Sequence, residues 1–238
     1  MPTIVDVAYI ILFAVVLTLF EHFVWFPRFR SEVAAGAPGA RVRAYRRATL
    51  GQWLVVAGAG VIWIANGRTA SDLRLAAPTG WRLLVSAIIS VAAIAFVVVQ
   101  LVSLARTTPA GLEAARPKLQ MYEFILPHTD LDLRWFTALS FTAGFCEEFL
   151  YRGYLAWVLH WWIGWTGGVA VGVALFGVAH LYQGKVGAVR ATLAGVVMGA
   201  IFLTTQWLVP AIILHALIDF GSGAVGHAVF RGAPPAES

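Results

Sequence analysis

The chain has little charge and almost no cysteine, and both shortages limit what kind of protein it can be. Of its 238 residues only 12% are Asp, Glu, Lys or Arg, whereas hydrophobic residues make up 60%. A soluble domain is about a quarter charged and could not bury this much apolar surface. The single cysteine, Cys146, excludes an internal disulfide and does not indicate a redox compartment. We therefore predict that the chain is embedded in lipid.

Several signatures of soluble enzymes are also missing. The sequence has no Ser nucleophile elbow, no glycine-rich phosphate loop and no zinc HExxH pattern. The net charge of +5 is largely carried by one arginine-rich loop. Orientation in a membrane explains that loop better than nucleic-acid binding does, so no nucleic-acid partner is expected.

Long apolar runs divide the chain into predicted membrane spans, ended by charges, prolines or turn residues. Seven are expected, over residues 4–25, 50–65, 81–104, 135–162, 168–181, 186–203 and 209–230. The fourth is too long for one simple span, and a break near Gly153 would make eight. The predicted fold class is therefore an all-α, polytopic transmembrane helical bundle of seven or eight spans. We expect one membrane domain over 1–238, with a catalytic core over 131–230 and a disordered tail over 231–238.

The basic segments predict the orientation of this bundle. The arginine-rich loop 28–47 and the polar segment 106–134 should both be cytoplasmic, as should Arg231. This places the N-terminus outside and the C-terminus in the cytoplasm. The Ala-, Gly- and Arg-rich composition favours a bacterial plasma membrane.

The first cluster of ionisable residues within a span is Glu147, Glu148 and Arg152. Such residues cost about 2.5–3.5 kcal/mol each in a bilayer, so they normally face the bundle interior and have partners. Glu148 and Arg152 are one helical turn apart and can form an ion pair. Two adjacent carboxylates at a buried position are suited to taking a proton from water. The alternative is a purely structural network of the three side chains.

The second cluster places Phe176 and His180 on one helix face. A lone His is more often a satisfied core or interface residue than a catalytic one. Gly172 and Gly177 allow a neighbouring helix to approach closely, which would bring His180 beside the carboxylates.

The third cluster is His215 and Asp219, again one turn apart, with Asp219 near the middle of the last span. The functional interpretation is that Asp219 orients His215, which then binds an oxyanion or the attacking water. The alternative is a hydrogen bond between helices that only satisfies both groups.

Two other chemistries remain open from the residues alone. Glu147, His180 and His215 are candidate ligands for a divalent metal such as zinc, and sequence cannot separate a metal-bound water from a Glu-activated one. Thiol catalysis by Cys146 is disfavoured, because the neighbouring Glu147 raises the pKa of a thiol.

Taken in order, the three clusters resemble the motif set of the CPBP (CAAX protease and bacteriocin-processing, or Abi) family, which includes the type II CAAX prenyl endopeptidases. The family pattern is EExxxR, FxxxH and HxxxN or HxxxD, and it is matched here between about residues 141 and 220. The resemblance implies an α-helical intramembrane protease, described for the family either as a metalloprotease or as a metal-free glutamate enzyme. The implied partners are membrane lipid and a protein or peptide substrate.

The resemblance also implies roles for the site residues. Glu147 and His180 would activate water, and Glu148 with Arg152 would support Glu147. His215 and Asp219 would stabilise the oxyanion or position the substrate. Because an ionised Asp cannot donate a hydrogen bond, an orienting role for Asp219 is favoured over a direct one.

Two other functions are compatible with buried charges. A proton- or ion-coupled transporter also uses buried Glu and His relays, although it does not need paired Glu followed by Arg. A non-catalytic membrane scaffold or immunity protein of the same family is the second alternative. The sequence leaves open whether a substrate is a prenylated CAAX protein or another membrane-associated peptide.

Overall fold

The computed structural model describes residues 1–231, and every regular element in that range is helical. The last seven residues lie outside the described part, and with them most of the tail predicted over 231–238. Six helices are long and apolar enough to cross a membrane, which makes this an integral membrane protein. They are Ile4–Ala34, Ala40–Ala65, Trp81–Ala105, Asp130–Ala179, Leu181–Thr205 and Val209–Phe230.

The first of these helices is longer than the predicted span 4–25. It is continuous through α1 (Ile4–Ile10), η1 (Ile11–Leu17), α2 (Thr18–Phe20), η2 (Glu21–Trp25) and α3 (Phe26–Ala34). Pro27, expected to end the helix, lies within it, directly after the π-helical turn η2. A π-helical turn shifts the hydrogen-bond register, which accommodates the missing N–H of proline.

The second helix, α4 (Ala40–Ala65), begins ten residues before the predicted span 50–65. The arginine-rich segment is therefore mostly helical rather than a loop, and only residues 35–39 connect α3 to α4. Hydropathy ends a span at the first charges, but arginine is a good helix former and can extend its guanidinium away from the apolar core. After the long helix α5 (Trp81–Ala105), the polar segment contains the short helix α6 (Pro109–Leu119) and the turn η3 (Gln120–Tyr122).

The segment Asp130–Ala179 accounts for the difference between six apolar helices and the seven or eight spans predicted. It comprises α7 (Asp130–Glu148), the π-helical η4 (Phe149–Leu155) and α8 (Ala156–Ala179). No break occurs near Gly153, but Gly164 has φ 70° and ψ 168°, a conformation that only glycine adopts readily. Beyond it α8 folds back, because Gly168 packs against Ala156. The number of crossings stays a prediction.

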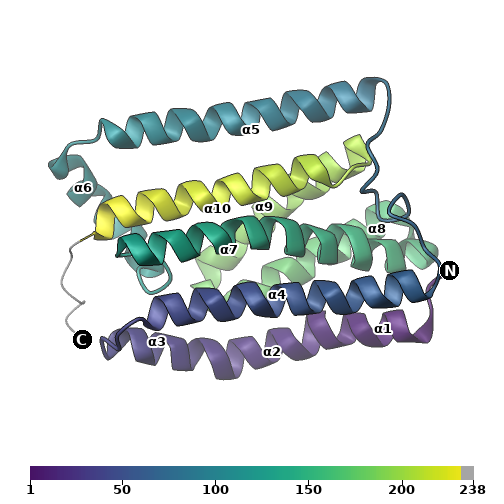
Figure 1. Cartoon of the computed structure of the whole chain (residues 1–238), viewed down its shortest axis with the longest axis horizontal. Helices are drawn as coiled ribbons and strands as arrows, with labels where there is room; N and C mark the ends of the chain where they lie inside the picture. Colours follow the sequence, from purple (N-terminus) through teal and green to yellow (C-terminus); the bar gives the residue numbers. More distant parts are fainter. Residues whose placement is uncertain (232–238) are drawn as a thin grey trace.

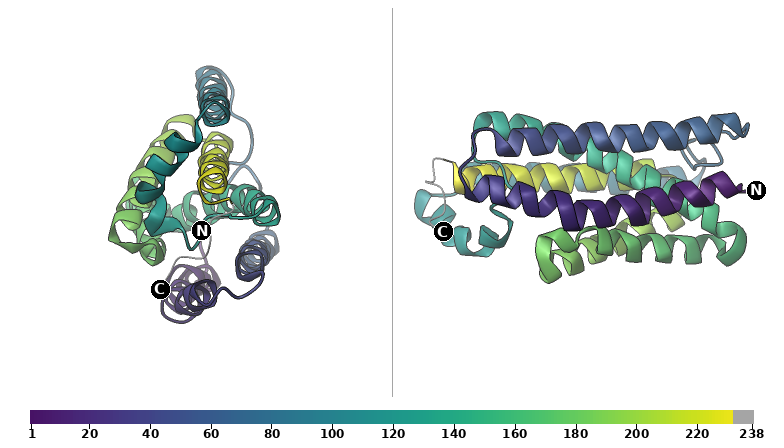
Figure 2. Two further views of the ribbon diagram at one scale, coloured as in Figure 1. Left: turned by 90° about the vertical axis from the view of Figure 1, so that its left-hand side faces the viewer. Right: turned by 90° about the horizontal axis from the view of Figure 1, so that it is seen from below.

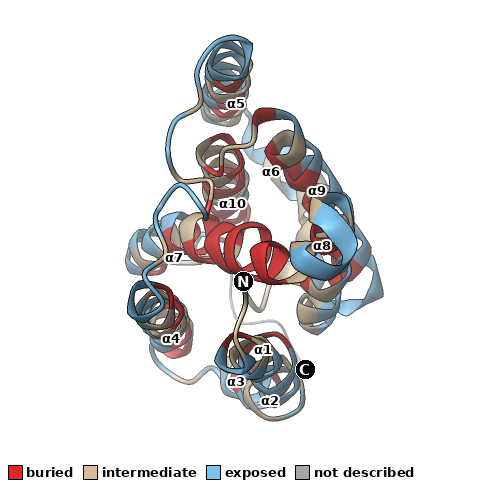
Figure 3. Ribbon diagram, turned by 90° about the vertical axis from the view of Figure 1, so that its right-hand side faces the viewer, coloured by how far each residue is buried: buried red, intermediate tan, exposed pale blue. Residues whose placement is uncertain are grey.

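The chain then enters η5 (Leu181–Gln183), α9 (Gly184–Thr205) and α10 (Val209–Phe230). In the bundle α10 packs between α7 and α5, α4 packs against the other side of α7, and α8 pairs with α9 (Figure 1). The N-terminal helix lies along the edge next to α4, as the two turned views show (Figure 2). Buried residues gather on α7 and η4 near the centre (Figure 3), and all seven residues of η4 are buried.

A compact polar cluster closes the end of the bundle at which the N-terminus lies (Figure 1). Asp6, with 0% of its surface exposed, accepts two hydrogen bonds of 2.7 Å from Arg68 and one of 2.7 Å from Tyr154. The Arg68 guanidinium lies over the rings of Trp63 and Trp157. We refer to these five side chains as the Asp6 cluster, and it ties the first helix to the 66–80 loop and to η4–α8.

Candidate active site

The junction of α7 and η4 carries three of the predicted site residues. Glu147 and Glu148 end α7, and Arg152 follows in η4. One turn earlier, Gly144 lets α7 approach α10, because a Cβ at this position would lie 2.7 Å from the backbone nitrogen of Ala216. The close approach brings His215, the neighbour of Ala216, beside the two glutamates.

A chain of hydrogen bonds joins Arg152, Glu148 and His215. Nη1 of Arg152 lies 3.0 Å from Oε1 of Glu148, and Nδ1 of His215 lies 2.9 Å from the same oxygen. Nη2 of Arg152 also donates to the carbonyl of Gly195 on α9, over 3.1 Å. An ionised carboxylate only accepts, so Nδ1 of His215 carries the proton and its orientation is fixed.

Glu147 occupies a different environment from Glu148. Its Oε1 accepts a 3.0 Å hydrogen bond from Nε2 of Gln52 on α4. Its Oε2 has no hydrogen-bond partner among the described residues and lies 3.8 Å from Nε2 of His215. The Glu147 side chain is 19% exposed and that of Glu148 is 0% exposed. Glu147 is therefore the carboxylate that water and substrate can reach.

His180 approaches from the end of α8. Its Nδ1 lies 2.8 Å from the carbonyl oxygen of Phe176. Because a carbonyl only accepts, Nδ1 is the donor, and Nε2 of the neutral ring is left as an acceptor. Gly177 allows this helix end to pack against α9, since a Cβ there would lie 2.1 Å from Oγ1 of Thr192. The Phe176 ring separates the site from the core and contacts the rings of both site histidines.

The predicted pairing of Asp219 with His215 differs in detail from the structure. Oδ2 of Asp219 lies 3.7 Å from Nε2 of His215, which is too long for a hydrogen bond. Glu148 instead holds the ring, from the opposite nitrogen. The contact that fixes the His215 ring is therefore made by Glu148, which also forms the ion pair with Arg152 that the helical spacing predicts. The roles of these residues stay predictions. Sequence spacing shows pairs within one helix, but it cannot show a partner on another.

These groups open into a cavity of about 660 Å³ within the bundle. Glu147, His180 and Asp219 line it, together with Gln52 and aromatic side chains of the N-terminal helix such as Phe26. Tyr182 and Gln183, which the sequence suggested were ordinary headgroup-level residues, also line it, as does Gln52, which had no evident chemistry. Tyr182 stacks on Phe26 with ring centroids 3.7 Å apart, and its carbonyl accepts a hydrogen bond from Arg30. No local signal distinguishes these polar residues from ordinary interfacial ones.

The side chains do not form a metal site as they stand. Within residues 1–231 no group of three or more His, Cys, Asp or Glu side chains is arranged to hold a metal ion. The predicted candidates Glu147, His180 and His215 all lie near the cavity, but Nδ1 of His215 is already bonded to Glu148 and that of His180 to Phe176. Cys146 is fully buried in a hydrophobic cluster and does not line the cavity.

The comparison with known families matches residues 129–221 to the family described as type II CAAX prenyl endopeptidase Rce1-like. These residues form an Rce1-like domain. The resemblance predicted from the three motifs is thus confirmed, and the family is one of proteases. The Rce1-like domain runs from the N-cap of α7 into α10, and it contains all of the paired carboxylates and histidines described above. Searches of curated proteins and of solved structures found no significant match.

Proposed function

We propose that this protein is an intramembrane endopeptidase in which Glu147 activates the water that attacks a peptide bond. The observation that carries the proposal is the unequal placement of the two glutamates. Glu148 is fully buried and bonded to Arg152 and His215 through Oε1, whereas the Glu147 side chain is 19% exposed and lines a cavity large enough for water and an extended peptide. A base must lie within hydrogen-bond reach of the water that it deprotonates.

The first chemical step forms a bond between the water oxygen and the carbonyl carbon of the substrate. The water proton passes to the carboxylate of Glu147, and the carbonyl oxygen becomes an oxyanion. His180, with Nε2 as an acceptor, holds the second hydrogen of the water. Nε2 of His215, when it carries a proton, donates to the oxyanion in an environment that excludes bulk water. The ring is already oriented by Glu148, so it does not need to reorganise.

The second step breaks the carbon–nitrogen bond. Glu147 returns its proton to the leaving amine and is regenerated as a carboxylate. The new carboxylic acid then gives up its remaining proton to the amine, so the products are a carboxylate and an ammonium group. Asp219, whose side chain is 38% exposed, can accept a hydrogen bond from a backbone N–H of the substrate. The apolar aromatic lining of the cavity suits a lipid-modified or hydrophobic chain end, and a prenylated CAAX-type protein is the substrate we favour.

The test compares cleavage of fluorogenic peptides by the purified protein and two variants in nanodiscs. Glu147→Gln keeps the size of the side chain and removes the base, and we expect kcat/KM to fall by about 10²-fold or more. Cys146→Ala is the matched control, because Cys146 is the adjacent residue but does not reach the cavity. The proposal fails if Glu147→Gln cleaves as fast as the wild type, or if the loss follows Cys146 instead. Ion flux through proteoliposomes without any cleavage would favour a transporter.

A further inference from the structure

The cavity that holds Glu147 is lined by charges of mainly one sign. Three carboxylates line it, those of Glu21, Glu147 and Asp219, and Arg47 is the one Arg or Lys that lines it within residues 1–231. The nearby Arg152 is 1% exposed and already bonded on both sides. Arg47 is therefore the one permanently cationic side chain of this lining that would attract a ligand with a negative group.

Arg47 lies against two aromatic rings, and the carboxylate of Glu21 is near enough to interact with it electrostatically. Its guanidinium carbon lies 4.8 Å from the ring centroid of Trp25 and 5.9 Å from that of Phe20. In the described part of the chain it forms neither an ion pair nor a hydrogen bond, so its five N–H donors are available. Stacking on a ring fixes the plane of a guanidinium and leaves its edge free for a carboxylate.

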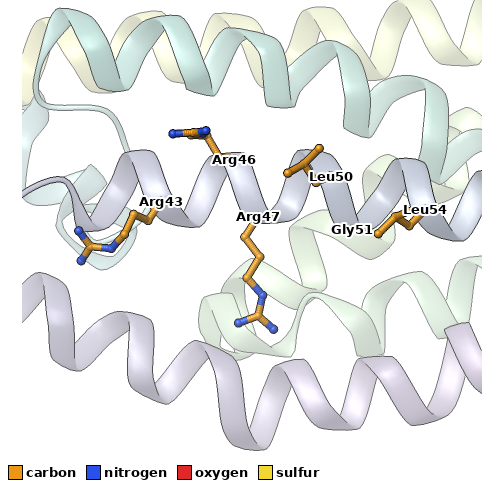
Figure 4. Close-up of a pocket in the computed structure, with 6 residues that line it drawn as sticks. All are labelled: Arg43, Arg46, Arg47, Leu50, Gly51 and Leu54. Carbon is orange, nitrogen blue, oxygen red and sulfur yellow. The ribbon is translucent and has the colours of Figure 1, made fainter.

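The neighbouring arginines of α4 have other partners. Nη2 of Arg43 pairs with Glu32 over 2.7 Å, and the Arg46 guanidinium lies over the ring of Trp135. Figure 4 shows the three side chains leaving α4 in different directions, with Arg47 pointing toward the N-terminal helix. The three arginines line one open surface hollow on α4, and only Arg47 also lines the cavity of Glu147. Arg47 is therefore the arginine that a ligand inside this cavity would meet.

We propose that Arg47 binds the C-terminal carboxylate of the peptide substrate and so determines which peptide bond reaches Glu147. This inference rests on the proposed peptidase function and adds a specificity-determining residue to it. A guanidinium binds a carboxylate through two parallel hydrogen bonds, which fixes direction as well as position. Arg47 would thereby distinguish a chain end from the middle of a membrane segment.

The register of α4 predicts the position of the cut. Arg47 precedes Gln52 by five residues, a rise of about 7.5 Å along the helix, and Gln52 is bonded to Glu147. An extended peptide covers about 3.3–3.6 Å per residue. Two residues cover the rise, and the reach of the arginine side chain adds one or two more. Cleavage is therefore expected about two to four residues from the C-terminus.

The experiment uses pairs of fluorogenic peptides that are identical except for the chain end, which is a free carboxylate or a carboxamide. Each carries an S-farnesyl cysteine four residues from the end. For the wild type in nanodiscs we expect KM to be about tenfold lower for the free acid. Arg47→Gln should remove that difference and change kcat by less than about threefold. Arg46→Gln, one residue away but outside the cavity, should keep the difference in KM. Mass spectrometry of the products identifies the bond that is cleaved.

Three outcomes would overturn the proposal. In the first, the wild type has the same KM for the acid and the amide peptide. In the second, Arg46→Gln removes the difference in KM as fully as Arg47→Gln does. In the third, Arg47→Gln slows cleavage of both peptides equally. If that equal loss depends on phosphatidylglycerol in the nanodisc, Arg47 is a lipid contact. Unchanged kinetics of Arg47→Gln on the amide show that the variant is folded.

A binding measurement separates this proposal from the peptidase function itself. In the Glu147→Gln background, fluorescence anisotropy compares the affinities of the acid and amide peptides, with and without Arg47→Gln. If no peptide is cleaved by the wild type, the peptidase proposal fails. A tenfold tighter binding of the acid that requires Arg47 would still support the proposal that Arg47 binds the C-terminal carboxylate. Equal affinities for the two peptides would refute it.

Discussion

The buried ion pair of Arg152 and Glu148 gives the most demanding test of the site. Arg152→Met leaves an uncompensated carboxylate on Glu148, a residue with 0% of its surface exposed. Removing one partner of a buried pair costs about 3–5 kcal/mol. In a protein of this size that corresponds to a fall in Tm of roughly 10 °C. Arg46→Met, which removes an exposed arginine, should change the free energy of unfolding by less than about 0.5 kcal/mol.

The double variant Glu148→Leu with Arg152→Met separates stability from catalysis. With both charges gone, more than half of the lost stability should return, because apolar replacements of a buried pair are often neutral. Activity should not return, since His215 has then lost the acceptor that orients its ring. Thermal unfolding followed by tryptophan fluorescence gives the stability, and peptide cleavage gives the activity. A double variant that is as unstable as Arg152→Met, or that is active, would refute this account of the network.

Three further changes test separate parts of the structure. Gly144→Ala places a Cβ 2.7 Å from the α10 backbone, so it should lower the free energy of unfolding by about 1–3 kcal/mol and remove most of the activity. Gly60→Ala, with open space around it, should change neither the stability nor the activity. Equal effects of the two substitutions would contradict the packing argument. Gln52→Leu removes the hydrogen bond to Glu147 and should lower kcat/KM about tenfold without lowering Tm. An unchanged kcat/KM would show that this hydrogen bond does not assist Glu147. Burial, with an arginine nearby, lowers the pKa of His128 to about 4 from its usual 6.5, so its folded form resists protonation. Stability should therefore fall between pH 6.5 and 4, and less in His128→Phe; parallel pH profiles would contradict this.

The sequence was sufficient to select the candidate site residues, because ionisable residues are conspicuous in apolar segments. The pairs within one helix, such as Glu148 with Arg152, follow from helical spacing alone. The family resemblance followed from the order of the motifs. The helix bounds were less predictable, since hydropathy marks where a span meets charge and not where the helix ends, as α4 shows.

Contacts between helices could not be predicted from the sequence. Nothing local indicates that Gln52 bonds Glu147, ninety-five residues later, or that Glu148 rather than Asp219 orients His215. A reversal between the predicted spans 135–162 and 168–181 was expected, but the sequence did not show that Gly164 forms it. A glycine in an apolar run has several uses, and only the packed structure shows that this one adopts a positive φ.

The Asp6 cluster and the cavity lie at different ends of the bundle, which bears on where water enters. Hydrolysis needs water, and the cavity extends to residues such as Phe29, Leu119 and Tyr122 at the end of the bundle opposite the N-terminus. None of the five side chains of the Asp6 cluster lines that cavity. Water and substrate are therefore expected to enter from that end, while the hydrogen bonds of Asp6 with Arg68 and Tyr154 hold the helices together at the other.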